Sequence, residues 1–337
     1  MFATIGRGLM ARGHAVVALV AYEEVGSGFR ARGLNAMRLP TAHTRLRGAR
    51  ALRRALGESG AEIAFVDMAR DIRLTAFASL GSPLAVIYCI SATNPPRDLF
   101  TRLAFRSVRL TVFLTEQLAR HALAAAPFMR RAPYQVIPNG VDCELFRPDP
   151  EAGRAFRTLY RLGDGPLLIG VGALAVEKHW DLLLDSLALL PRPTPPLVLC
   201  GSGTLEGALR AQAERLALDV QFIGCVPPAV LVGAYNGASC VVHTCHVETF
   251  GMCVAEAMAC GRPVVGVASG TLPEVIGDAG VVAPPEDPAA FADLVNELLR
   301  NSARRDALGA AARRRVVKRF SLEPMVRAYV DLVESIP

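Results

Sequence analysis

Two glutamates eight positions apart, Glu248 and Glu256, have the type and spacing to take part in chemistry. They lie in the stretch HVETFGMCVAEAMACGRPVVG, residues 246–266, with an aromatic–glycine pair between them. The stretch predicts a strand that ends near Cys245 and a helix that begins near Met252. The first backbone N–H groups of such a helix have no intrahelical partners and carry partial positive charge. They could therefore bind a phosphate or a diphosphate.

The two carboxylates would lie on either side of a diphosphate bound there. Gly251 would let the ligand approach the backbone closely. Glu256, about one turn into the helix, is well placed to accept hydrogen bonds from sugar hydroxyls, whereas Glu248 lies in the preceding loop. This pattern suggests a nucleotide sugar, with the ribose at one glutamate and the second sugar at the other. Two acids at this spacing also occur by chance, so the pattern alone leaves ordinary surface carboxylates open.

A lysine and a pair of glycines follow two other predicted strands. Only Lys178 and Lys318 among the 37 basic residues are lysines, and Lys178 stands at a strand-to-helix turn. A compact ammonium there suits a phosphate site, with a chance surface lysine as the alternative. Gly201 and Gly203 of CGSG would open the end of another strand to a ligand. They do not form a dinucleotide-binding fingerprint, because Gly207 comes one residue too late.

Parallel strands are needed to position these residues, and the second half of the chain predicts them. Uniformly apolar segments alternate there with helical ones, which is typical of a parallel sheet covered on both faces. Ligands of such sheets bind beyond the carboxyl ends of the strands. The predicted strands are 166–174, 196–203, 220–226, 240–245, 263–268 and 280–284. The predicted helices are 177–190, 204–217 with Thr204 as its N-cap, 228–238, one after Gly251, 287–300, 302–319 and 322–335.

The first half of the chain shows the same alternation with weaker boundaries. Its predicted strands are 14–22, 33–39, 61–68, 84–91, 109–115 and 134–138. Residues 137–150 are rich in Pro, Asn and Gly and predict a linker. The predicted fold class is therefore α/β, with two doubly wound Rossmann-like domains facing a cleft.

Composition and charge agree with a globular protein of two domains. The chain has 337 residues, of which 52% are hydrophobic and 20% charged. Residues 1–150 contain 20 Arg and 11 Asp or Glu, a balance of +9, while the remainder has 17 basic and 20 acidic residues, a balance of −3. The basic half could attract an anionic membrane face or a phosphorylated substrate; a solvated arginine-rich surface is the alternative.

The eight cysteines include no C-x-x-C pair, which predicts reduced and mostly buried thiols. Cys240, His243, Cys245 and His246 invite a zinc interpretation, but their spacing matches no usual zinc pattern. Side chains that alternate along a strand would also point apart. We predict no metal and no cofactor. No secretory signal or clean membrane span is evident, so we expect a cytoplasmic protein with peripheral contact at the inner membrane face.

Six motifs together closely resemble glycosyltransferase family 4, whose members are retaining enzymes of the GT-B fold. They are VIPNGVDCELFRP, VGALAVEKHWDLLLDSL, LVLCGSGTLEGALR, FIGCVPPAVLVGAYNGA, HVETFGMCVAEAMACGRPVV and GTLPEVIGDAGVV, and they run in family order from about residue 134 onward. The resemblance implies an acceptor-side domain 1–145, a donor-binding domain 146–320 and a C-terminal helix 321–337 that crosses back to the first domain.

The resemblance also implies roles for individual residues. Glu248 would contact the donor sugar near the reaction centre, and Glu256 would contact the ribose. Lys178 and the backbone amides of residues 250–252 would hold the diphosphate, so that no metal is needed. The candidate catalytic residues are Glu248 and Lys178, and the candidate substrate-binding residues are Glu256, Thr249, Phe250, Gly251, Met252, Gly172, Gly201, Gly203 and Asn94. The expected partners are a nucleotide-sugar donor and a glycan or lipid-linked acceptor, without nucleic acid.

Two positions depart from the family pattern. Ala173 stands in VGAL where the family usually has an arginine. Where the family has a histidine, the stretch YCISATNPPRD offers Ser91, Thr93, Asn94 and Arg97. An alternative is therefore a non-catalytic GT-B protein that binds a nucleotide sugar or a partner subunit. A nicotinamide-dependent oxidoreductase would need a glycine fingerprint that the chain lacks.

The chain opens with a predicted helix whose apolar positions, Phe2, Ile5, Leu9 and Met10, follow helical spacing, and then enters a strand. In the resembled family a first strand and a glycine-rich turn precede this helix. That strand lies near the centre of a doubly wound sheet, so two neighbours would lose a ladder without it. We therefore expect a truncated or misassigned start, and a chain that is poorly stable and weakly active as written.

Overall fold

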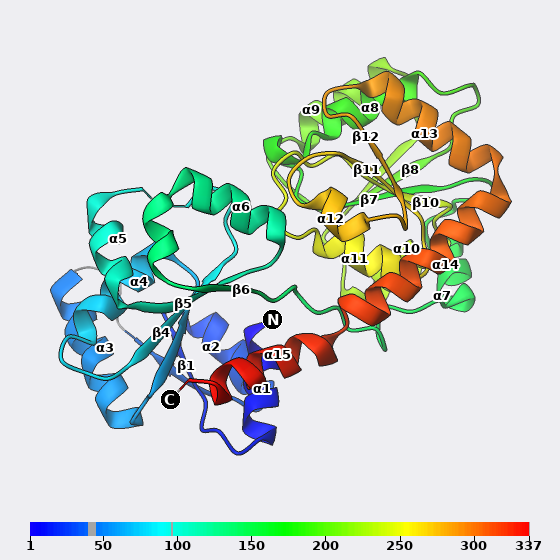
Figure 1. The fold of residues 1–337 in the computed structure, drawn as a ribbon. Coiled ribbons are helices and arrows are strands. Elements are labelled where there is room, and N and C mark those ends of the chain that lie inside the picture. The colour runs from blue at the N-terminus through cyan, green and yellow to red at the C-terminus, as the bar shows by residue number, and fades with distance from the viewer. Residues whose placement is uncertain (40–44, 96, 337) are drawn as a thin grey trace. The chain divides into compact units, whose positions relative to one another are not determined.

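The computed structural model describes residues 1–39, 45–95 and 97–336, which form two compact units (Figure 1). The first unit comprises Met1–Gly140 and Leu322–Pro337, and the second comprises Val141–Ser321. Pro337, the last residue of the predicted helical segment 321–337, lies outside the described residues. Each unit is α/β with parallel strands, which confirms the predicted fold class. The cleft stays a prediction.

The first unit contains two parallel sheets. Its strands are β1 (Val17–Val20), β2 (Asn35–Arg38), β3 (Ile63–Val66), β4 (Ala85–Ile90), β5 (Val108–Phe113) and β6 (Tyr134–Val136). Its helices are α1 (Phe2–Ala11), α2 (Glu23–Arg30), α3 (Arg45–Ser59), α4 (Ala69–Ala78), α5 (Leu99–Ala104), α6 (Glu116–Ala125) and α15 (Leu322–Glu334), with 3₁₀ turns η1 (Phe105–Ser107) and η2 (Pro127–Arg131). Strands β1 and β2 pair with each other, and β3-β4-β5-β6 form the second sheet. The predicted strands are thus present with shorter bounds.

Strands β1 and β3 each pair on one side only within the described chain. Both are apolar throughout, yet only their last residues, Val20 and Val66, are buried. In β4, by contrast, every residue after Ala85 is buried. The two sheets of this unit therefore each present an open strand edge with unpaired backbone groups.

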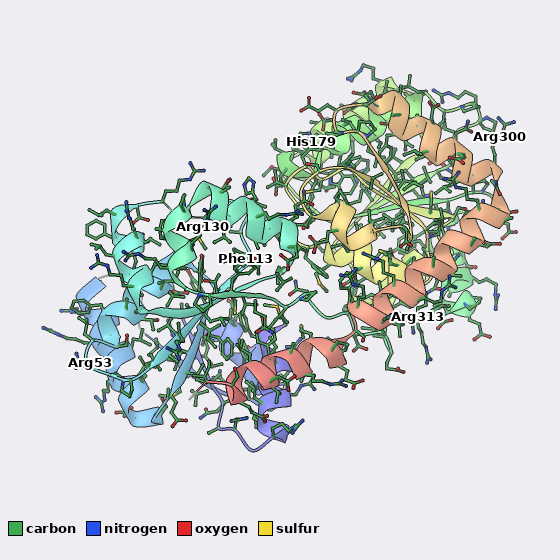
Figure 2. The ribbon with its side chains drawn as sticks, in the orientation of Figure 1. Arg53, Phe113, Arg130, His179, Arg300 and Arg313 are labelled. Carbon is green, nitrogen blue, oxygen red and sulfur yellow. The ribbon has the colours of Figure 1, made fainter. Side chains whose placement is uncertain are left out.

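The first unit closes around its first and last helices. Ile5 and Leu9 of α1 pack with Tyr329 and Val330 of α15 in one hydrophobic cluster. The cluster also contains Ile87, Val112 and Ile137 from the sheet side. The prediction that Met10 shares the apolar face of α1 is wrong, because its side chain is 43% exposed. Figure 2 shows Phe113 inside this unit and Arg53 projecting from it.

The second unit contains a single six-stranded parallel sheet of order β12-β11-β10-β7-β8-β9. The strands are β7 (Leu168–Val171), β8 (Leu197–Cys200), β9 (Val220–Gly224), β10 (Cys240–His243), β11 (Val264–Val267) and β12 (Val281–Ala283). The helices are α7 (Pro150–Leu159), α8 (Trp180–Ala188), α9 (Glu206–Arg215), α10 (Pro228–Gly237), α11 (Met252–Ala259), α12 (Leu272–Ile276), α13 (Pro288–Arg300) and α14 (Ser302–Arg319), with the 3₁₀ turn η3 (Val176–Lys178) before α8. The predicted strands and helices of this half are present, most of them with shorter bounds, and α7 and α12 were not predicted.

Some helices of this unit begin at a residue with a capping side chain, but one predicted cap is absent. Asp149 caps α7 through a hydrogen bond from Ala152 N, with Pro150 at the first helical position. The predicted cap Thr204 is wrong, because α9 begins at Glu206 and no side chain caps it. Among the described residues, none of the helices combines the length and apolar character needed to cross a bilayer.

Candidate functional site

The candidate site lies where the strand order of the second sheet reverses. From β7, the strands β8 and β9 extend to one side and β10 to β12 to the other. β7 and β10 are direct neighbours, with Cys240 opposite Leu168. Loops that leave the carboxyl ends of two such strands diverge and open a binding site between them. Lys178 lies in the loop after β7, and Glu248 lies in the loop after β10.

The loop that holds Lys178 is anchored at both ends. Lys178 ends η3, and the next residue, His179, has a φ of +49°, a left-handed conformation that side chains other than glycine rarely adopt. The buried Trp180 donates from its indole nitrogen to the carbonyl oxygen of Ala173 at 2.9 Å. The hydroxyl of Thr244 donates to the carbonyl oxygen of Lys178 at 2.9 Å. These bonds tie the loop after β7 to the loop after β10.

Two stacked histidine rings join the same loops. The rings of His179 and His246 are 3.9 Å apart between centroids and inclined by 19°. The backbone N–H of His246 also donates to the carbonyl oxygen of Glu177 at 3.4 Å. Burial, and next the neighbouring His179, lower the pKa of His246, which favours the neutral form that a stacked pair requires.

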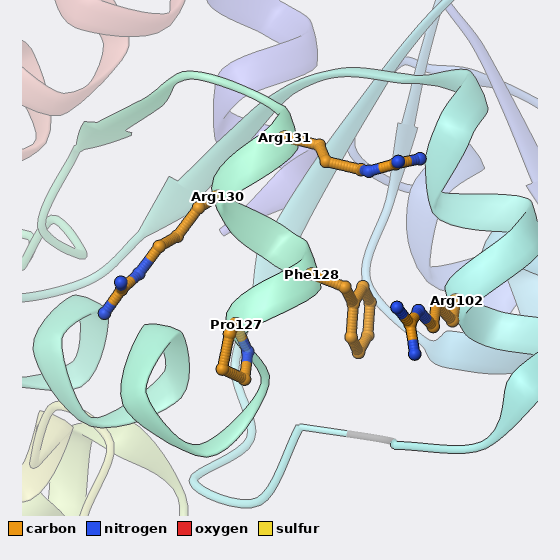
Figure 3. Close-up of a pocket in the computed structure, with 5 residues that line it drawn as sticks. All are labelled: Arg102, Pro127, Phe128, Arg130 and Arg131. Carbon is orange, nitrogen blue, oxygen red and sulfur yellow. The ribbon is translucent and has the colours of Figure 1, made fainter.

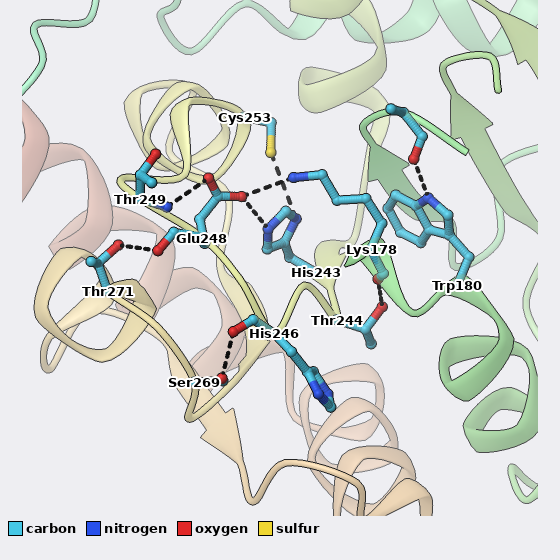
Figure 4. Close-up of polar contacts among 11 residues, drawn as sticks. Lys178, Trp180, His243, Thr244, His246, Glu248, Thr249, Cys253, Ser269 and Thr271 are labelled. Carbon is cyan, nitrogen blue, oxygen red and sulfur yellow. Dashed lines mark hydrogen bonds and ion pairs between the residues drawn. The ribbon is translucent and has the colours of Figure 1, made fainter. Parts of the chain in front are cut away.

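The carboxylate of Glu248 is held by two cationic side chains and one amide (Figure 4). Its Oε2 accepts from Lys178 Nζ at 2.9 Å and contacts His243 Nε2 at 3.1 Å. Its Oε1 accepts from the backbone N–H of Thr249 at 3.2 Å. Burial alone would raise the pKa of Glu248, but the hydrogen bond from His243 and the charge of Lys178 lower it to about 2. Glu248 is therefore a fixed anion at neutral pH.

The pKa values of both partners of Glu248 are raised. Burial acts to lower the pKa of Lys178, but the charge of Glu248 and its hydrogen bond raise it overall. Burial also opposes a charge on His243, whose side chain is 1% exposed. The Cys253 and Cys245 sulfurs and the Glu248 carboxylate outweigh that effect and hold the pKa of His243 well above its ordinary value. The cluster therefore carries positive charge next to the first turn of α11.

The first turn of α11 presents backbone donors. Gly251 is its N-cap, with φ +83°, and no side chain accepts a hydrogen bond from its first N–H groups. Phe250 is buried and packs edge-on against Phe320, with ring centroids 5.5 Å apart. Met252 is 36% exposed. This arrangement leaves the N–H groups of the turn available to an anion.

The second glutamate of the pair, Glu256, lies one turn into α11. It accepts a hydrogen bond from the hydroxyl of Tyr235 at 3.0 Å. Burial raises the pKa of Glu256 to about 7, although the hydrogen bond from Tyr235 acts in the opposite direction. The two glutamates thus differ in charge near neutral pH, because Glu248 is ionised and Glu256 is close to its midpoint.

The glycines at the ends of β7 and β8 allow the backbone to pack against itself. A Cβ atom added at Gly201 would lie 1.9 Å from the carbonyl oxygen of Gly172, and one at Gly203 would lie 2.3 Å from that of Leu174. Only glycine fits these two approaches. The sequence suggested instead that these glycines leave room for a ligand, which stays a prediction.

Asn94 lies in the first unit, in an exposed loop after β4. Ser91 and Arg97 of the same loop are also exposed. The structure brings together Lys178, Glu248, Thr249 and the first turn of α11, all within the second unit. A role for Asn94 toward the same ligand stays a prediction.

Sequence reasoning missed His243, Tyr235 and Cys253. His243 was considered as a zinc ligand and that role was rejected, yet its ring contacts Glu248 and the thiol of Cys253, the latter at 3.6 Å. The signal was a single basic residue within the otherwise uncharged stretch CVVHTC. A buried titratable group in such a strand needs a partner.

His243, Cys245 and Glu248 could in principle hold a metal, since one ligand atom of each lies within 4.8 Å of the others. The donor set fits poorly, because the Lys178 ammonium already neutralises the Glu248 carboxylate at 2.9 Å and would repel a second cation. We therefore assign no metal to these residues.

Comparison with known proteins identifies the family of this region. Residues 156–315 match the family model of glycosyl transferases group 1. A D-inositol 3-phosphate glycosyltransferase of Xylanimonas cellulosilytica is 36% identical over 58% of this chain and 50% of its own length. A GDP-mannose-dependent alpha-(1-6)-phosphatidylinositol monomannoside mannosyltransferase of Mycolicibacterium smegmatis is 33% identical over 56% of this chain and 53% of its own. The chain spans about half the length of these curated relatives.

Solved structures extend the likeness to the whole fold. The Anabaena protein Alr3699/HepE, crystallised with UDP, has a TM-score of 0.83 and 18% identity, with 99% of this chain and 96% of that chain covered. At this identity the likeness concerns the fold alone, and it places the chain among GT-B structures. With the family match over residues 156–315, most of the second unit of this chain resembles the group 1 glycosyl transferases.

Proposed function

We propose that this chain transfers a sugar from a nucleotide-diphosphate sugar to a glycan or lipid-linked acceptor. The observation that carries the proposal is the pairing of Lys178 and Glu248 beside the uncapped first turn of α11, where the strand order reverses. An ammonium and a row of free N–H groups suit a diphosphate, and the nearby carboxylates suit sugar hydroxyls. The nucleoside diphosphate bound by the Anabaena structure supports the choice of donor class.

Each residue of the site has a proposed role in this reaction. Lys178 and the N–H groups of residues 250–252 stabilise the charge that develops on the departing diphosphate. Glu248 holds Lys178 and His243 in place, and its fixed negative charge faces the sugar on which positive charge develops. Glu256 accepts hydrogen bonds from the ribose hydroxyls. Because cationic and helix-end groups carry the leaving-group charge, we propose transfer without a metal and, from the family resemblance, with retention of configuration.

The names of two relatives support a proposal for the acceptor class. One of them is described as acting on D-inositol 3-phosphate and another on a phosphatidylinositol monomannoside. We therefore propose a polyol phosphate or a phosphoinositide-type glycolipid of the cell envelope as the acceptor.

An exposed surface of the first unit supports contact with an anionic membrane. In α5, Leu99 and Phe100 are each 65% exposed and Leu103 is 48% exposed. Beside this helix lies a hollow of about 540 Å³, shown in Figure 3, where Arg102 lies against the Phe128 ring. Its other lining residues are Pro127, Arg130 and Arg131. None of the ion pairs in the described part of the chain involves Arg102, Arg130 or Arg131.

Apolar side chains flanked by unpaired arginines are suited to the interface of an anionic bilayer. Each arginine near such a surface contributes about 1 kcal/mol, so the three lining arginines contribute about 3 kcal/mol. We propose that this surface holds the protein peripherally at the cytoplasmic face of the membrane.

The transfer proposal is tested with a panel of UDP- and GDP-sugars, each offered with inositol phosphates and with phosphoinositide glycolipids. Transfer should persist in the presence of a chelator. NMR of the product should show that the sugar keeps the anomeric configuration it had in the donor. Donor binding without any transfer would favour the non-catalytic alternative. Lys178→Ala is compared with Lys318→Ala, a matched control, because Lys318 is an exposed lysine on α14.

The membrane proposal is tested separately, by flotation with vesicles. The protein should float with phosphatidylglycerol vesicles and remain behind with phosphatidylcholine vesicles. Replacing Arg102, Arg130 and Arg131 with Gln should abolish flotation, whereas Arg53→Gln, an exposed arginine of α3, should leave it unchanged. Flotation that survives the triple replacement would rule out this surface.

A further inference from the structure

Cys253 is the second residue of α11, and its thiol points at a histidine ring (Figure 4). The sulfur lies 3.6 Å from Nδ1 of His243. The side chain of Cys253 is partly exposed, so small molecules can reach it. No role for this thiol follows from the proposed transfer.

The orientation of His243 suits proton transfer with this thiol. The other ring nitrogen, Nε2, lies 3.1 Å from Glu248 Oε2, and an ionised carboxylate can only accept a hydrogen bond. Nε2 therefore carries hydrogen, and Nδ1 faces the sulfur. The ring is 1% exposed and is fixed by its surroundings. Thiol, imidazole and carboxylate thus stand in the order of an activated cysteine nucleophile.

Positively charged groups lie near the sulfur of Cys253. Cys253 lies in the first turn of α11, and helix N-termini stabilise negative charge. The raised pKa of His243 favours the imidazolium, a cation 3.6 Å from the sulfur. Lys178 is a second cation of the same cluster, because it contacts the Glu248 oxygen that also contacts His243.

The other cysteines differ from Cys253 in exposure or in partner. Cys143 is partly exposed, but burial raises its pKa. Cys89, Cys200, Cys240, Cys245 and Cys260 are buried. Burial raises the pKa of Cys240 to about 12. Cys225 is exposed, but its hydrogen-bond partner is the hydroxyl of Ser202 at 3.1 Å rather than a histidine. Cys225 is therefore the natural comparison for Cys253.

We propose that Cys253 is a reactive thiol that small electrophiles, hydroperoxides in particular, modify, and that this modification blocks the diphosphate end of the donor site. The first part rests on the local geometry alone. The second part rests on the proposed function, because the amides of residues 250–252 lie in the same turn as the thiol.

The reaction with a hydroperoxide is balanced by groups already present. The Cys253 thiolate attacks one peroxide oxygen, an S–O bond forms, and the O–O bond breaks. The leaving oxygen takes the electron pair and a proton from the His243 imidazolium, and departs as water or an alcohol. Sulfur is oxidised by two electrons to a sulfenic acid, and the peroxide is reduced by two.

Alkylation by iodoacetamide, followed by peptide mass spectrometry, tests the reactivity. The S–C bond forms as iodide leaves with its electron pair. On the native protein, Cys253 should react about tenfold faster than Cys225 although it is less exposed. Equal or faster labelling of Cys225 would overturn the proposal.

His243→Gln should bring the labelling rate of Cys253 down to that of Cys225. The five buried cysteines serve as an internal check, because they stay unlabelled only if the variant is folded. Glu248→Gln, which leaves His243 in place without its anionic partner, is the second variant and should also slow Cys253. Unchanged Cys253 labelling in either folded variant contradicts the assigned activation.

The blocking effect is tested with UDP and GDP as probes. Either nucleotide should slow labelling of Cys253 and leave Cys225 unaffected. Hydrogen peroxide should produce a sulfenic acid at Cys253 that dimedone traps, and nucleotide binding should fall by at least about tenfold in calorimetry. Cys253→Ser should remove this sensitivity to peroxide.

These outcomes separate the two proposals. Fast labelling without nucleotide protection would refute the blocking effect while the reactive thiol stands. Absence of sugar transfer with fast, nucleotide-protected labelling would refute the proposed function alone.

Discussion

Replacing Glu256 with glutamine should stabilise the second unit at pH 8, although Glu256 is a candidate ligand residue. Burial raises the pKa of Glu256 to about 7 in the folded state, from an ordinary value of 4.5. Its contribution to the free energy of unfolding is therefore fully present below pH 4.5 and is lost as the pH rises through 7. The difference between the two pKa values corresponds to at most about 3 kcal/mol. A glutamine keeps an acceptor for Tyr235 and has no charge to bury.

Urea unfolding, followed by tryptophan fluorescence, measures the free energy of unfolding of the second unit. Trp180 is the single tryptophan of the chain and is buried in α8 of the second unit. Wild type should lose up to about 3 kcal/mol between pH 4.5 and pH 8, and Glu256→Gln should lose much less. Tyr235→Phe is the matched control. Removing the hydrogen bond, which lowers the pKa of Glu256, should raise that pKa and extend the loss of stability to higher pH. The same pH dependence in wild type and Glu256→Gln would refute this reasoning.

Three further predictions concern the site and the sheet edges. Lys178→Ala should weaken UDP or GDP binding by about 1.5–3 kcal/mol and leave nucleoside binding nearly unchanged; equal losses in calorimetry would remove Lys178 from the phosphate site. Glu248→Gln should lower turnover far more than nucleotide affinity, and it should abolish the part of stability that wild type loses as pH falls from 4.5 through about 2. Backbone amides of β1 and β2 should exchange hydrogen faster than those of β4 and β5, because each open sheet edge favours local opening; equal protection by mass spectrometry would contradict this.

The alternation of strands and helices could be predicted from the sequence because apolar runs such as PLLIGVGAL have one plausible place, a buried parallel strand. The ends of the helices were harder to predict from the sequence. Thr204 has a preferred capping side chain, but α9 begins two residues later, because the backbone at Gly203 packs against Leu174. Such a contact between distant segments has no signal in the local sequence.

The site was predicted as a set of residues but not as a network. The spacing of Glu248 and Glu256 indicated the loop and the helix correctly, since both follow from local periodicity. That Glu248 binds Lys178 and His243 could not be read from the sequence, because these residues come from two loops and a strand. The opposite pKa changes of the two glutamates also depend on burial and on partners distant in the sequence.

The place of α15 in the first unit has a consequence for the order of folding during synthesis. Domains ordinarily fold as they leave the ribosome, the N-terminal one first. Here the second unit, Val141–Ser321, is complete before α15 has been made. The hydrophobic cluster of the first unit still lacks Met325, Tyr329 and Leu332 at that moment. The first unit therefore cannot complete this cluster until α15 has been made. The surface of Ile5 and Leu9 stays uncovered until then, while the second unit can already fold.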